Sequence, residues 1–135
     1  VIGDSVNLAS RIEGLTKYYD AGILVCNTTK ISLEQKHKLR EVDLIRVRGQ
    51  NKPNEIWQVL DYHDEISFPH ISDVLEIHGI AMALWRAGDW KHSLEKFEEL
   101  LQISPQDRIA MIYADRCRNF VKEPPAEDWD GVWNA

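Results

Sequence analysis

The sequence predicts an α+β fold followed by an all-helical region. Two observations support this: the first sixty residues alternate helix-period segments with short branched apolar runs, and the residues after about 73 show helical periodicity alone. A stretch with a proline, several charges and little periodicity separates the two. We expect four parts: an α+β region over 1–62, a linker over 63–72, helices over 73–121 and an extended tail over 122–135.

The α+β region begins with a helix and a buried strand. Apolar residues recur at helical spacing after Asp4 and Ser5, either of which can cap a helix that should run to about Tyr18. The apolar run 22–26 is short and branched, which is typical of a buried strand. A second helix is expected over 29–38.

Two strand-like runs, residues 39–48 and 55–60, close this region. Between them lie turn-forming residues that include a glycine, two asparagines and a proline. The two runs therefore predict an antiparallel hairpin.

The helical region resembles one tetratricopeptide (TPR) repeat, a hairpin of two helices, over residues 77–105. The matching positions are Ala81, Leu84, Gly88, Trp90, Leu94, Phe97, Leu100 and Pro105. Ser93 stands where the repeat usually has a small alanine, and Pro105 is expected to begin a third helix. One repeat cannot bury both of its faces, so this hairpin must pack against the α+β region, the third helix or another subunit.

The tail contains Pro124 and Pro125, which favour an extended backbone, and two tryptophans in an acidic strip. The tryptophans Trp129 and Trp133 indicate docking into a groove, either within this chain or on a protein partner. A partly disordered chain end explains the same residues equally well.

Composition excludes several classes of function. The 16 Lys and Arg against 22 Asp and Glu give a net charge of −6, which disfavours binding to nucleic acid through its phosphates. The histidines and cysteines show no metal-ligand spacing, so we expect no metal site within this chain. The longest apolar run, residues 80–85, is far too short to cross a bilayer.

The candidate chemistry lies near the start of the chain. Asn7 and Arg11 are four residues apart, so they share one helix face, about 6 Å apart at Cβ. Near a helix N-terminus the dipole favours anions, and an arginine fork suits a phosphate. Spacing alone nevertheless favours a plainer interpretation, in which both side chains are solvated at the surface.

A family resemblance adds weight to the first interpretation. The motif V-I-G-D-S-V-N-L-A-S-R-I-E, followed by G-I-L-V-C and I-R-V-R-G, resembles the C-terminal half of the class III adenylate/guanylate cyclase catalytic domain. The resemblance covers about residues 1–60 and implies part of a ferredoxin-like fold. The helical hairpin and the P-P-x-x-D-W-D-G-V-W tail are similar to an extension that follows this domain in some bacterial members.

The family converts a nucleoside triphosphate, ATP or GTP, to a 3′,5′-cyclic nucleotide and pyrophosphate. By resemblance, Asn7 would orient the ribose and Arg11 would stabilise charge at the α-phosphate. Arg48 stands where the family usually has a lysine for the terminal phosphates, and it keeps the charge. Arg46, two residues earlier on the same predicted strand face, would add to the positive field. Charges on a solvent-facing strand edge remain the alternative for both arginines.

The resemblance also implies partners that this chain does not supply. The family uses two ions, Mg²⁺ or Mn²⁺, bound by two aspartates that we expect upstream of Val1, together with the residues that select the base. The catalytic domain works as a head-to-tail homodimer, so we predict that this chain alone is inactive. The segment should be cytoplasmic, and family members often carry membrane-anchoring regions before the catalytic domain.

A second hypothesis is a protein-interaction module. The α+β region would then be a degenerate cyclase remnant, and the TPR-like hairpin with its tail would be the working part. Its support is the aromatic content of Trp85, Trp90, Trp129 and Trp133, although packing between helices explains these residues better.

Overall fold

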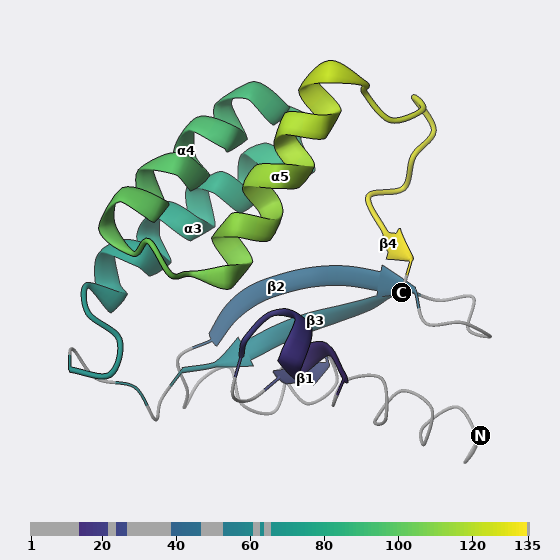
Figure 1. Ribbon diagram of the computed structural model, residues 1–135. Helices are drawn as coiled ribbons and strands as arrows, with labels where there is room; N and C mark the ends of the chain where they lie inside the picture. The colour runs from purple at the N-terminus through teal and green to yellow at the C-terminus, as the bar shows by residue number, and fades with distance from the viewer. Residues whose placement is uncertain are drawn as a thin grey trace, which may run out of the picture. The chain divides into compact units, whose positions relative to one another are not determined.

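The computed structural model describes residues 14–21, 24–26, 39–46, 53–60, 63 and 66–134 of the chain. The chain divides into a sheet unit, residues 1–62 with 130–135, and a helical unit, residues 63–129. Strands and helices both occur, which confirms the α+β prediction (Figure 1). The predicted caps Asp4 and Ser5, the helix over 29–38 and the turn of the hairpin lie outside the described residues.

The first described segment of the sheet unit is the end of a helix. It stops at Tyr18, as the sequence predicted. Asp20 then adopts a positive φ of 51°. The amides of Asp20 and Ala21 donate to the carbonyls of Lys17 and Thr16, which is the Schellman arrangement that closes a helix. Aspartate is among the few residues besides glycine that tolerate this conformation.

The described strands form one four-stranded sheet. Its order is β1 (Leu24–Cys26), β3 (Asn54–Val59), β2 (Leu39–Arg46) and β4 (Trp133–Asn134). Strands β2 and β3 pair antiparallel, which confirms the hairpin. Strand β4 comes from the tail and runs parallel to β2 along its other edge (Figure 1). No local pattern in the sequence predicts this pairing.

Apolar side chains fill the core of the sheet unit. Val42, Ile56 and Leu60 are fully buried, and Ile45 is nearly so. Branched side chains of this kind fit the pleated surface of a sheet. Alternate residues of β3 are buried, as expected for a strand with one covered face.

The helical unit consists of α3 (Ile71–Arg86), α4 (Trp90–Ile103) and α5 (Arg108–Lys122), and α4 packs against both of the others. Pro105 lies in the turn before α5, so the prediction that it begins the third helix is wrong. Asp107 is the cap instead: its carboxylate accepts the amide of Ala110 at 3.1 Å and sets the start of the helix.

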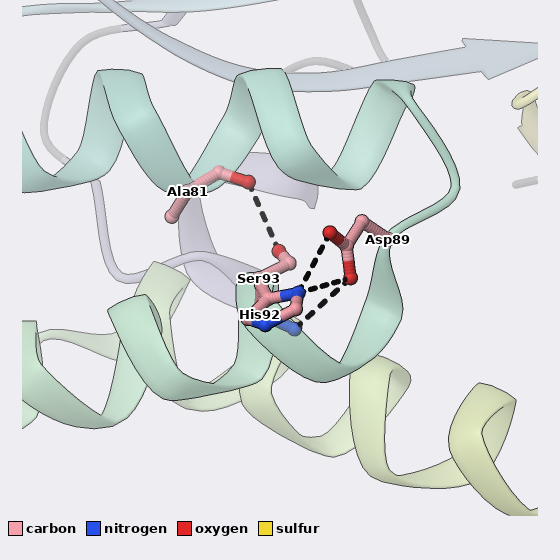
Figure 2. A network of polar contacts seen from close by, with 4 residues as sticks. All are labelled: Ala81, Asp89, His92 and Ser93. Carbon is pink, nitrogen blue, oxygen red and sulfur yellow. Dashed lines mark hydrogen bonds and ion pairs between the residues drawn. The ribbon is translucent and has the colours of Figure 1, made fainter.

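Gly88 and Asp89 form the turn between α3 and α4, as the sequence predicted. Gly88 has a φ of 78°, which suits glycine, and its amide donates to the carbonyl of Trp85. The Asp89 carboxylate then caps α4. It accepts one hydrogen bond from the His92 backbone amide at 3.3 Å and another from the His92 ring nitrogen Nδ1 at 2.8 Å (Figure 2). The hydrogen bond from the His92 side chain lowers the pKa of Asp89 below its ordinary value of 3.8.

The structure explains the serine that departs from the TPR pattern. Ser93 is fully buried, and its hydroxyl donates to the carbonyl of Ala81 at 2.9 Å (Figure 2). The hydroxyl therefore links α4 to α3 by a hydrogen bond. An alanine at this position would let the two helices pack closely but could not form this bond. Cys117 is also buried, and desolvation raises the pKa of its thiol, so it behaves as a small apolar core residue.

Four aromatic rings from four segments form one cluster. They are Trp85 of α3, Trp90 of α4, Phe120 of α5 and Trp129 of the tail, and every pair of ring centroids is 5.0 to 6.0 Å apart. Trp85 is buried and also contacts Tyr113 at 5.1 Å. Such contacts add stabilisation beyond burial, so the tail contributes Trp129, partly buried, to the packing of the helical unit.

No helix in the described part of the chain is both long enough and apolar enough to cross a membrane. The longest is α3, with 16 residues.

Candidate phosphate-binding site

The structure describes one of the four predicted site residues, Arg46. Asn7, Arg11 and Arg48 lie outside the described residues, so their predicted roles stay predictions. Arg46 is the last residue of β2, and its side chain is 34% exposed.

A β-bulge decides which way Arg46 faces. Arg40 pairs with Gln58, but the regular register shifts between Glu41 and Asp43, where Val42 is an extra residue on β2. Strict alternation would place Arg46 on the same buried face as Arg40. The extra residue reverses the faces beyond the bulge and moves Arg46 to the more exposed side.

Arg46 meets a carboxylate from the far end of the chain. Its guanidinium donates to Oδ2 of Asp130 at 2.8 Å. This hydrogen bond lowers the pKa of Asp130 below its ordinary value of 3.8, so the carboxylate is charged at neutral pH. The guanidinium that the sequence assigned to substrate phosphates is thus bound to an internal anion.

The second oxygen of Asp130 shapes the strand that follows. Oδ1 accepts the amide of Val132 at 3.0 Å, a local turn that directs the chain into β4. Val132 is buried, and β4 then pairs Trp133 with Ile45 and Asn134 with Arg46. The carboxylate, the turn and the strand together cover the edge of β2 beside Arg46.

Sequence reasoning missed two buried polar pairs on β2. Arg40 is 4% exposed and donates through two nitrogens to Oε1 of Gln58, at 2.8 and 3.1 Å. Asp43 is 3% exposed and accepts the hydroxyl of Tyr19 and the amide of Leu44. The sequence held no signal for these pairs, because β2 carries two further charged residues, Glu41 and Arg46, and nothing local distinguishes them from Arg40 and Asp43.

The two buried pairs position the strand. Tyr19 lies just after the helix end, so its bond to Asp43 fixes that end against β2, and the Arg40–Gln58 bonds fix the register of β2 on β3. Within the described ranges, no group of three His, Cys, Asp or Glu side chains is arranged to hold a metal ion.

Comparisons with known proteins agree with the cyclase resemblance. The chain is 30% identical over 124 residues to the terminal-differentiation specific adenylate cyclase of Dictyostelium discoideum, a match that covers 90% of this chain. It is 42% identical over 62 residues, 44% of the chain, to an adenylate cyclase of Anabaena cylindrica. No family model and no solved structure matches. The chain is therefore related to proteins named adenylate cyclase.

The matches cover only 6% and 12% of the lengths of these two relatives. The Dictyostelium match, however, cannot be confined to one unit, because each unit is about half of this chain. The similarity to that cyclase thus extends through parts of both the sheet unit and the helical unit.

Proposed function

We propose that this chain is part of a class III adenylate cyclase and supplies the transition-state side of a site at a homodimer interface. The observation that carries the proposal is the match to two adenylate cyclases, together with the motif around Asn7 and Arg11. Because both relatives are named adenylate cyclases, ATP is the proposed substrate, in preference to GTP.

In this proposal, each arginine has a separate task. Arg11 stabilises the charge that develops on the α-phosphate as the ribose 3′-hydroxyl attacks, while Asn7 orients the ribose. Arg48 binds the terminal phosphates, and Arg46, on the exposed side of β2, adds positive potential beside it. A guanidinium fork suits phosphate oxygens, which is why arginine can replace the family's usual lysine.

Two Mg²⁺ or Mn²⁺ ions would supply charge neutralisation and activate the attacking hydroxyl. The residues proposed to bind them belong to the partner subunit and lie upstream of this chain. In this proposal the segment is inactive by itself and is cytoplasmic.

The test is the Arg11→Ala variant of the longest protein that contains this chain. Arg11 contributes only to charge in the transition state, so kcat should fall by at least about a hundredfold, with dimerisation and circular dichroism unchanged. Lys17→Ala is the matched control, because Lys17 is an exposed cation further along the same predicted helix. Unchanged turnover in Arg11→Ala would remove this residue from the mechanism.

The interaction-module hypothesis has lost its main support. Trp85 is buried, and Trp90 and Trp129 are partly buried in the same aromatic cluster, so three of its four tryptophans serve internal packing. Nothing in the described residues favours it over the cyclase proposal.

A further inference from the structure

The contact between Arg46 and Asp130 joins a candidate substrate-binding residue to the chain's own tail. Asp130 presents a carboxylate oxygen at 2.8 Å from the guanidinium, which is the geometry that a phosphate oxygen would take at the same place. The two residues are 84 positions apart, and both belong to the sheet unit.

We propose that residues 130–134 form an internal latch, in which Asp130 occupies the Arg46 phosphate site and must be displaced by the substrate triphosphate. The proposal rests on the proposed cyclase function and adds a regulation to it. The latch lowers the apparent affinity of the site for nucleotide until the triphosphate, or a movement of the tail, releases Asp130.

The contacts that hold the latch in place are weak enough for a triphosphate to displace Asp130. Both side chains of the ion pair are substantially exposed, 34% for Arg46 and 50% for Asp130, so water screens their attraction. Strand β4 has only two residues and pairs with β2 through Ile45 and Arg46 alone. A triphosphate carries several negative charges against the single charge of Asp130, so it should compete effectively for the guanidinium.

The latch nevertheless has a defined structure. The same carboxylate that binds Arg46 through Oδ2 also accepts the Val132 amide through Oδ1. Release of Asp130 from Arg46 therefore loosens the turn that leads into β4. Loss of the ion pair and loss of the strand pairing should occur together, which gives the proposal a structural readout besides activity.

The kinetic test compares Asp130→Asn with Asp128→Asn in the longest protein that contains this chain. Asp128 is an exposed acid two residues earlier, so its substitution makes the same charge change without touching Arg46. Asp130→Asn should lower KM for ATP by about two- to fivefold, the range expected for an exposed ion pair, and leave kcat unchanged. Asp128→Asn should leave KM unchanged.

The Arg46→Gln variant tests phosphate binding by Arg46 separately from the latch. If Arg46 binds phosphate, Arg46→Gln raises KM, and adding Asp130→Asn to it changes KM no further, because the two residues act as a pair. A raised KM in Arg46→Gln with an unchanged or raised KM in Asp130→Asn overturns the latch but leaves the cyclase proposal intact. An unchanged KM in Arg46→Gln overturns the latch and the role of Arg46, while Arg11→Ala still decides the cyclase proposal.

The structural test uses hydrogen exchange with inorganic triphosphate as the probe. Adding triphosphate to the unmodified protein should speed exchange of the amides of residues 132–134, because the anion replaces Asp130 at Arg46. The Arg46→Gln variant should already exchange quickly there and should not respond to the anion. Slow exchange that triphosphate leaves unchanged in the unmodified protein would overturn the latch.

Discussion

The two units of this chain are stabilised in different ways. The helical unit is closed by aromatic packing, with Trp85 at the centre of a cluster that draws on all three helices and the tail. Both units bury charged side chains, but those of the sheet unit join separate segments through hydrogen bonds, Arg40 to Gln58 and Asp43 to Tyr19. In the helical unit, the buried Asp107 caps its own helix and the buried Arg116 lies over the Tyr113 ring of the same helix. Apolar packing tolerates replacement by other apolar side chains, whereas a buried polar pair fixes one geometry.

This difference indicates that the sheet unit holds charged side chains of β2 in fixed positions relative to neighbouring segments. Burying a charged group is costly unless its hydrogen bonds are satisfied, so a domain that does so twice along one strand gains a defined strand position. That strand ends in Arg46, the candidate phosphate ligand.

The largest expected effect is on the helical unit. Trp85→Ala should lower its free energy of unfolding by about 3–5 kcal/mol, because it leaves a cavity at the centre of the aromatic cluster. Ile80→Ala is the control on the same helix, since Ile80 is 44% exposed, and it should cost less than about 1 kcal/mol. Hydrogen exchange of amides in α3, α4 and α5 measures both variants. Equal loss of protection in β2 and β3 would contradict the separation of the two units.

A smaller effect is expected in the sheet unit. Tyr19→Phe removes the hydroxyl that Asp43 accepts and should cost about 1–3 kcal/mol, because the buried carboxylate loses a donor. Tyr18→Phe is the control, since Tyr18 is 46% exposed. In the Tyr19→Phe background, Asp43→Asn should cost less than it does alone. Additive costs, measured by urea unfolding, would show that the two residues do not act as a pair.

The smallest effect concerns the cap of α4 and depends on pH. The pKa of Asp89 is lowered in the folded protein, chiefly by the His92 side chain, so its charge stabilises the fold fully above the ordinary value of 3.8. That stabilisation is lost as the pH falls through the lowered pKa. Asp89→Asn keeps a capping side chain but removes the charge. Its Tm should lie slightly below that of the unmodified protein at about pH 6, and the two should converge in acid. A Tm difference that persists in strong acid would contradict this assignment.

Local patterns in the sequence predicted the regular elements well. The helix end at Tyr18, the hairpin of β2 and β3, and the helices on either side of Gly88 follow from periodicity and turn chemistry, which act over a few residues. The start of α5 was misplaced because two capping signals compete there, Pro105 and Asp107, and the aspartate provides the hydrogen bond.

The sequence by itself determined the α+β class, the helical hairpin and the motif that suggests a cyclase, because each depends on a pattern of residues that are close together in the chain. Only the tertiary structure decided that Val42 forms a bulge, that Arg46 therefore faces the exposed side, and that Asp130 returns to meet it. Strand register and contacts across 84 residues depend on how the whole sheet assembles, and no local pattern encodes such a pairing.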